Sequence, residues 1–192
     1  MKVRESGMPD EQRWATFFEP CRILQDLDFS ERNADVVDFG CGYGTFSLAA
    51  ARMTAATVYA IDLDPEMTGA TARKAQSLGV TNVRIVERDF CAQGTGLADG
   101  SVGYAMLFNI LHAEAPLALL QEAYRVLVDD GLVSVMHWIP DPSTPRGPPM
   151  AIRPRPEQCR DWVRQAGFDL KRPYVELPPY HYGVVGQKPG LR

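Results

Sequence analysis

Five short apolar runs alternate with segments of helical periodicity along residues 35–138. Each run is five to seven residues long, which is the length and character of a buried strand. Because parallel strands need long crossovers, this alternation predicts right-handed βαβ units with helices on both faces of the sheet. We therefore expect an α/β fold with a doubly wound, mostly parallel sheet. The expected strands span residues 35–39, 57–61, 83–87, 102–108 and 132–138.

The segments between the strands carry helix start and stop signals. Asp64 is a capping residue followed by Pro65 at the first helical position, and Gly79 suits the left-handed end of that helix. Two further helices are expected over residues 45–53 and 116–127. Ligands of doubly wound sheets bind beyond the carboxyl ends of the strands, so we expect a site in the loops there.

Both ends of the chain add to this alternating region. Residues 1–30 contain aromatic and aliphatic side chains at helical spacing, and we expect them to form a helical lid. Residues 139–156 contain seven prolines and almost no periodicity, which predicts a loop. A last helix over 157–166 and a closing hairpin of strands 174–177 and 182–185 follow. At 192 residues, the whole chain is expected to form one domain.

Composition and charge argue against several classes of protein. No window reaches the eighteen or so apolar residues of a membrane span, and residues 1–10 lack the apolar stretch of a signal peptide. The four cysteines are scattered, which argues against a metal site or disulfide framework and fits a reducing cytoplasm. We expect a cytoplasmic protein without membrane or metal partners.

Charge is unevenly distributed within a net charge of −4. Residues 1–140 hold 11 basic and 19 acidic side chains, and such an acidic body disfavours binding to nucleic acid. Residues 141–192 hold 9 basic and 5 acidic side chains. This basic segment is either a solvated surface or a site for an anionic substrate. Its clustered arginines are Arg146, Arg153, Arg155, Arg160 and Arg164.

The strongest motif is Asp38-Phe39-Gly40-Cys41-Gly42-Tyr43-Gly44, an acid followed by alternate glycines between an expected strand and an expected helix. Glycines let the backbone turn tightly and approach a ligand closely, because they lack Cβ. Asp62 ends the second strand eighteen residues beyond Gly44, where a carboxylate can accept hydrogen bonds from both hydroxyls of a ribose. The two features together predict a nucleoside-containing cofactor.

Three features favour a sulfonium cofactor over a dinucleotide. The glycine spacing is G-x-G-x-G, whereas dinucleotide-binding loops have G-x-G-x-x-G. Asp38 precedes the turn, although a pyrophosphate favours an electropositive loop. Asp89-Phe90 places an acid and an aromatic ring after the third strand, where an adenine would lie. Carboxylates around the turn therefore suit a cationic ligand better than a dianionic one.

Residues 36–44 and 61–67 resemble the first and second motifs of the class I S-adenosylmethionine-dependent methyltransferases. The resemblance covers roughly residues 20–186 and points to the compact members of that Rossmann-like family. It implies S-adenosyl-L-methionine as the cofactor and about seven strands, the last one antiparallel. The chain departs from the family at Gly103, where many relatives have Asp, and at residues 129–131, where Pro-Gly-Gly is common.

The resemblance also implies roles for individual residues. Gly40, Cys41, Gly42 and Gly44 would line the methionine part of the cofactor, with Asp38 close behind. A purely structural role, in a turn, a cap or the core, is the alternative for Asp62, Leu63, Met67, Asp89 and Asn109. Their implied contacts are Asp62 with the ribose, Leu63 and Met67 with the adenine, Asp89 and Phe90 with the adenine edge, and Asn109 with the methionine amino group.

The acceptor side is less defined. Methyl transfer needs mainly alignment, and a general base is required only when the acceptor must lose a proton, so no catalytic residue is assigned. His112, His137 and His181 are candidate substrate-site residues, each with a pKa range suited to proton transfer. Trp14 and Tyr180 are candidates for an aromatic cover. Because long insertions are absent, we expect a small-molecule acceptor.

Two other interpretations remain open. An NAD(P)-dependent reductase would require the dinucleotide glycine spacing and a Tyr/Lys or His catalytic set. A cofactor-binding but inactive partner subunit would show tight cofactor binding without turnover and a large exposed apolar patch.

Overall fold

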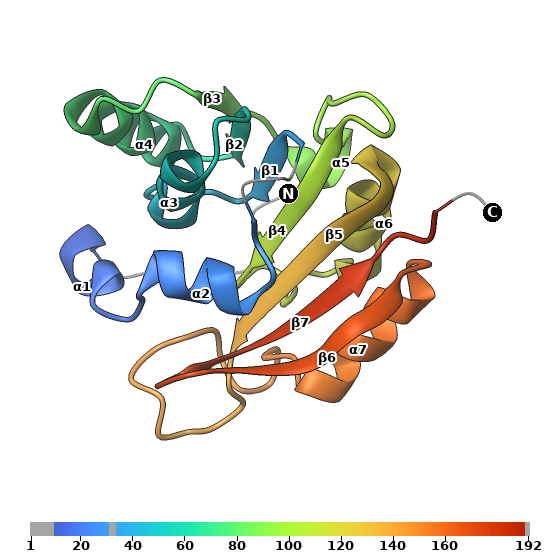
Figure 1. Cartoon of the computed structure of the whole chain (residues 1–192). Coiled ribbons are helices and arrows are strands. Elements are labelled where there is room, and N and C mark those ends of the chain that lie inside the picture. Colours follow the sequence, from blue (N-terminus) through green and yellow to red (C-terminus); the bar gives the residue numbers. More distant parts are fainter. Residues whose placement is uncertain (1–9, 31–33, 191–192) are drawn as a thin grey trace.

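The computed structural model describes residues 10–30 and 34–190 (Figure 1). The first nine residues of the expected N-terminal lid lie outside the described residues. The described chain forms a seven-stranded sheet in the order β3-β2-β1-β4-β5-β7-β6. Its strands are β1 (Val36–Phe39), β2 (Val58–Asp62), β3 (Val83–Glu87), β4 (Val102–Phe108), β5 (Leu127–Trp138), β6 (Asp169–Leu177) and β7 (His181–Gln187).

Strands β1 to β5 pair in parallel, and β7 runs antiparallel to its neighbours β5 and β6. The expected doubly wound, mostly parallel sheet with an antiparallel last strand is therefore confirmed. The strand order reverses between β1 and β4, which is where ligands of such sheets bind. In Figure 1 the blue N-terminal helices and the orange 139–156 loop lie at the end of the sheet where β4 and β5 finish.

A hydrophobic core lies on each face of the sheet. Helices α2 and α3 cover one face, and α6 and α7 cover the other. Because side chains alternate along a strand, Val135 of β5 belongs to the α6/α7 core, and Met136 and Trp138 belong to the α2/α3 core and its margin. The helices are α1 (Glu11–Ala15), α2 (Pro20–Asp26), α3 (Thr45–Met53), α4 (Pro65–Leu78), α5 (Phe90–Gln93), α6 (Pro116–Val126) and α7 (Pro156–Gln165). Within the described ranges, no helix is long and apolar enough to cross a membrane.

Three elements differ from the expectation. β5 begins at Leu127, five residues earlier than expected. Leu127 pairs with Val102 of β4, a bulged region with Asp130 at φ +61° follows, and the pairing resumes at Leu132. β6 begins at Asp169, and as an edge strand with exposed charges and Pro173 it lacks the apolar alternation that predicts a strand. α5 is a single turn capped by Asp89, too short to show periodicity.

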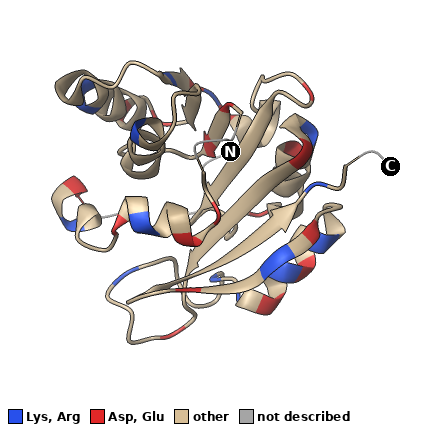
Figure 2. Ribbon diagram, viewed as in Figure 1, with Lys and Arg blue, Asp and Glu red and all other residues tan. Residues whose placement is uncertain are grey.

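The arginines of the C-terminal segment do not form one patch. Figure 2 shows acidic residues among the basic ones on α7. There Arg160 pairs with Glu157 at 3.4 Å and Arg164 with Asp161 at 3.3 Å. Arg153, in contrast, is buried. These pairs fit the interpretation of α7 as a solvated surface. Arg153 does not belong to that surface.

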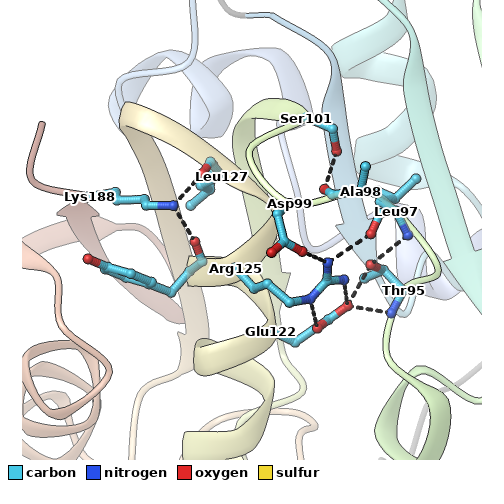
Figure 3. Close-up of polar contacts among 10 residues, drawn as sticks. Thr95, Leu97, Ala98, Asp99, Ser101, Glu122, Arg125, Leu127 and Lys188 are labelled. Atoms are coloured by element: carbon cyan, nitrogen blue, oxygen red, sulfur yellow. Dashed lines mark hydrogen bonds and ion pairs between the residues drawn. The ribbon is translucent and has the colours of Figure 1, made fainter. Parts of the chain in front are cut away.

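A polar network attaches the 94–101 loop to α6 (Figure 3). Glu122 accepts hydrogen bonds from the Thr95 amide and hydroxyl, both at 2.6 Å, and from two nitrogens of Arg125. Arg125 also donates to Asp99 and to the Leu97 carbonyl. Burial alone would raise the pKa of Glu122, but the bonds from Arg125 and Thr95 outweigh it and lower that pKa to about 2. The network fixes a loop far from the ligand-binding end of the sheet.

This network predicts a pH-dependent contribution to stability. Because the pKa of folded Glu122 lies below its ordinary value of 4.5, its contribution is present above that pH and is lost as the pH falls toward 2. Glu122→Gln should lower the free energy of unfolding by about 1–2 kcal/mol at pH 7. Urea denaturation of both proteins between pH 7 and pH 2.5 measures this. Parallel stability curves over that range would contradict it.

Candidate functional site

A tight turn in which alternate residues are left-handed glycines follows β1. Gly40, Gly42 and Gly44 have φ of +76°, +53° and +72°, a region that costs a residue with Cβ about 1–2 kcal/mol. The amides of Gly40 and Cys41 both donate to the Ile61 carbonyl, at 2.8 and 3.0 Å. This glycine turn, residues 40–44, is thereby anchored on β2 before the chain enters α3.

The peptide groups on either side of Gly42 are held by side chains from two other elements. The Gly42 amide donates to Asp62 Oδ2 at 2.8 Å, and the Thr71 hydroxyl donates to the Gly42 carbonyl at 2.9 Å. Asp62 Oδ1 accepts from the Asp64 amide at 3.0 Å. Burial raises the pKa of Asp62. Because a carboxylate oxygen accepts more than one hydrogen bond, the half-buried Asp62 keeps capacity for a ligand.

Asp38 supplies a second carboxyl group beneath the turn. It is 3% exposed and accepts a hydrogen bond of 2.5 Å from the Ser47 hydroxyl. Burial raises the pKa of Asp38 to about 7, against the hydrogen bond from Ser47 and with the help of the nearby Asp62. The group is therefore close to half protonated at neutral pH, and a cation placed beside it would favour its ionised form.

A cavity of about 580 Å³ opens beside the turn, at the carboxyl ends of β1, β2, β4 and β5. One part, here called the carboxylate end, is lined by residues 40–43 and Asp38, Asp62, Leu63, Asp64 and Met67. The other, the aromatic end, is lined by Trp14, Phe46, Phe108, Ile110, Trp138 and Pro148. Thr45, Phe90, Asn109 and His112 complete the wall. The rings of the aromatic end come from α1, α3, β4 and β5, and the two ends are adjacent, since a Cβ on Gly40 would lie 3.2 Å from Ile110.

The cavity thus brings together most of the residues singled out from the sequence. They are Trp14, Asp38, Gly40, Cys41, Gly42, Asp62, Leu63, Met67, Phe90, Asn109 and His112. Gly44 and Asp89 are not in the wall. A Cβ on Gly44 would meet Thr71, so this glycine faces α4, and Asp89 caps α5 by accepting from the amides of residues 91 and 92.

His137, Tyr180 and His181 also lie outside the wall, in the layer behind it. His137 is fully buried with its Nε2 3.4 Å from Nδ1 of His112, and burial and then the nearby His112 lower its pKa well below the usual value. His181 lies behind Trp138, and the centroids of the two rings are 4.2 Å apart. Burial lowers the pKa of His181 to about 3. Tyr180 stacks on Trp138. Burial thus holds His137 and His181 neutral. Of the three histidines, His112 is the one in the cavity wall.

Asn109 is a constrained residue at the end of β4. It has φ of +57°, and its amide donates to the Met136 carbonyl at 2.7 Å. Its side chain is buried, and neither Oδ1 nor Nδ2 has a hydrogen-bond partner among the described residues. An unsatisfied buried amide costs about 1–3 kcal/mol. Backbone strain of this kind clusters at binding sites.

Part of the aromatic end is built by residues that the sequence does not single out. Phe46 and Phe108 contact each other with ring centroids 4.8 Å apart, and Pro148 comes from the proline-rich loop. The detectable signal is the position of Phe108 as the last residue of a strand beside the expected site. Nothing in the local sequence indicates that Pro148 returns to the cavity.

Arg153 holds that loop in place. Proline lacks an amide hydrogen, so a loop with seven prolines has few backbone donors of its own, and the Arg153 guanidinium supplies donors instead. Gly147 lies between this guanidinium and Trp138, since a Cβ there would be 2.8 Å from each of them. The acceptors are the carbonyls of Ile139, Asp141, Arg146 and Pro148 and the hydroxyl of Thr144.

Comparison with known proteins decides the family. A family model described as a methyltransferase domain matches residues 36–131, half of the chain. The chain belongs to this methyltransferase family. A solved S-adenosylmethionine-dependent methyltransferase from Aquifex aeolicus is 25% identical, with a TM-score of 0.81 over 93% of both chains. Membership implies S-adenosyl-L-methionine as the cofactor of this methyltransferase.

Two further relatives show how far the likeness extends. The ribosomal protein L11 methyltransferase of Methylococcus capsulatus is 38% identical over 109 residues, which are 56% of this chain and 34% of that protein. The methyltransferase therefore spans about a third of the length of this curated relative. The [4+2]-cyclase SpnF is 17% identical with a TM-score of 0.76, covering 98% of this chain and 86% of its own, and shows the fold alone.

The cavity fits the cofactor of the methyltransferase family. The glycine turn offers backbone without Cβ, since a Cβ on Gly40 would already lie 3.2 Å from Ile110. Asp62 is half-buried with capacity for hydroxyl donors, and Asp38 is a buried carboxyl group beside the place where a cation would bind. The carboxylate end therefore suits a cationic nucleoside.

The glycine turn predicts unequal costs for two alanine substitutions. Gly44 and Gly79 both have positive φ, but a Cβ on Gly44 would lie 2.7 Å from Thr71, whereas one on Gly79 has nothing within 4 Å. Gly79→Ala should cost about 1–2 kcal/mol and Gly44→Ala a further 1–3 kcal/mol or so, measured by urea unfolding. Equal costs would mean that Thr71 yields without loss.

Proposed function

We propose that this methyltransferase transfers a methyl group from S-adenosyl-L-methionine to a small-molecule acceptor. One observation carries the proposal: a single cavity joins a carboxylate end built on the glycine turn to an adjacent aromatic end. A cavity of about 580 Å³ lies within the range of small-molecule sites and has room for a cofactor beside a modest second ligand.

The proposed cofactor contacts follow the positions of the wall residues. Gly40, Cys41 and Gly42 line the methionine part, and Asp38 lies beneath it. Asp62 binds the ribose hydroxyls. In the remaining roles, Leu63 and Met67 pack on the adenine, Asp89 and Phe90 border it, Gly44 shapes the turn, and Asn109 lies near the methionine amino group.

The chain's own contribution to the reaction is alignment. When bound, S-adenosyl-L-methionine supplies an activated methyl group and a sulfide leaving group. Transfer would form a bond from an acceptor lone pair to the methyl carbon and break the carbon–sulfur bond, whose electron pair would go to sulfur. The aromatic end holds the acceptor in line for this displacement. For an acceptor that loses a proton, His112 is the histidine of the cavity wall and would receive it.

The other interpretations have less support. The glycine spacing and the carboxyl groups under the turn disfavour a dinucleotide, whose pyrophosphate needs positive potential. The ribosomal protein L11 methyltransferases methylate a protein, as their name states, but they share only about a third of their length with this chain. Their acceptor is therefore not carried over.

Calorimetric titration with S-adenosylmethionine, S-adenosylhomocysteine and NADPH tests the proposal. The first two should bind with micromolar affinity and NADPH should not. Asp62→Ala should weaken binding of S-adenosylhomocysteine by about 1.5–3 kcal/mol, the scale for hydrogen bonds to a charged group. Asp99→Ala, a carboxylate in the loop network outside the cavity, is the control and should leave affinity unchanged. Binding of NADPH alone would overturn the proposal.

Proton release gives a second test. With a pKa of about 7, Asp38 is half protonated at neutral pH, and a bound sulfonium favours its ionised form. Binding of S-adenosylmethionine should release about half a proton at pH 7 and almost none at pH 9, where Asp38 is already ionised. Calorimetry in buffers of different ionisation enthalpy measures this number. A release that persists unchanged in Asp38→Asn would assign the proton to another group.

A further inference from the structure

The aromatic end of the cavity differs from the carboxylate end in its charge. Asp38, Asp62 and Asp64 are the acidic residues of the described wall, and all three belong to the carboxylate end. No lysine or arginine among the described residues lines the cavity. The aromatic end consists of four rings, one isoleucine and one proline.

The charged groups nearest to this end are already satisfied or neutral. Arg153 approaches through Gly147, but its donors are occupied by loop carbonyls and the Thr144 hydroxyl. Behind the wall, burial keeps His137 and His181 neutral. A carboxylate or phosphate on the acceptor would therefore enter a desolvated space whose wall has the side-chain nitrogens of Asn109 and His112 but no lysine or arginine to pair with, which costs several kcal/mol.

A cationic acceptor is disfavoured for a different reason. Aromatic faces attract cations, but the proposed cofactor would bring a sulfonium charge to the same cavity. The buried guanidinium of Arg153 adds positive potential and lowers the pKa of His181, after the larger effect of burial. Like charges within one cavity repel each other in a medium of low dielectric.

From these observations we infer that the acceptor is an uncharged, planar aromatic molecule that packs against Trp14, Phe46, Phe108 and Trp138. This inference rests on the proposed function, because it describes the second ligand of the same cavity. Rings favour offset or edge-to-face contacts with other rings, and the four side chains offer such contacts from α1, α3, β4 and β5. The nucleophile is a neutral group on that ring, such as a hydroxyl, whose oxygen would bond to the methyl carbon while its proton passes to His112 in the wall.

The test uses the intact protein saturated with sinefungin, an unreactive analogue of S-adenosylmethionine that carries an ammonium group where the cofactor has its sulfonium. Three probes of similar size are titrated by calorimetry: 2-naphthol, 2-naphthoate and 2-naphthylmethylammonium. The uncharged naphthol should bind at least about tenfold more tightly than either charged probe, because the wall has no lysine or arginine for the carboxylate and the charge of the bound analogue repels the ammonium. Equal or tighter binding of a charged probe, or binding of none of the three, would overturn the inference.

A matched pair of tryptophan variants locates the binding. Trp14 is partly exposed on α1 and lines the aromatic end, whereas Trp162 is partly buried on α7, outside the cavity wall. Trp14→Ala should weaken naphthol binding about three- to tenfold, the usual scale for one aromatic contact, and Trp162→Ala should leave it unchanged. Equal effects of the two variants would overturn the inference.

The cofactor titration separates the two proposals. If S-adenosylhomocysteine fails to bind, the proposed function falls and the acceptor class falls with it. If S-adenosylhomocysteine binds and naphthol does not, the proposed function stands and only the acceptor class is wrong.

Discussion

The peptide groups flanking Gly42 are fixed from both sides, and the rest of the site depends on them. Asp62, at the end of β2, holds the amide, and Thr71, on α4, holds the carbonyl. One turn is therefore tied to two elements that follow it in the chain. The bonds set the direction in which β1 passes into α3 and keep the left-handed glycines in place. The same carboxylate that stabilises the turn is the one that we propose to bind the ribose, so in this proposal fold and binding share one group.

The two faces of the sheet and the edge at the carboxyl ends of its strands have different roles. The cores covered by α2 with α3 and by α6 with α7 stabilise the molecule, whereas the cavity lies at the carboxyl ends of the strands. Within that edge, β1, β2 and the segment after β2 supply the acids, and α1, α3, β4 and β5 supply the rings of the aromatic end. A charged ligand and an uncharged one can thus lie in one cavity while each meets a suitable wall.

Local features were predictable from the sequence, and long-range ones were not. The glycine turn and Asp62 are encoded by residue type and spacing next to strands, and the family comparison confirms the methyltransferase motif. His137 and Trp138 are neighbours at a strand end, yet alternation turns them to opposite faces, so only Trp138 meets the cavity. Arg153 is one of several arginines in a basic segment, and nothing nearby indicates that its guanidinium turns inward. Such choices depend on tertiary packing, which a local pattern does not contain.

The attachment of the 139–156 loop has a consequence for how this protein can diverge. The loop is held mainly by one guanidinium bonded to its carbonyls, which every residue type possesses, and not by a ladder with the sheet. Most of its side chains can therefore be exchanged without loss of the anchoring bonds, provided that Arg153 and Gly147 remain. Selection can alter the part of the cavity wall that this loop supplies at Pro148 while the glycine turn stays the same. Substitutions in this segment can therefore change which acceptor is preferred without any change in the residues proposed to bind the cofactor.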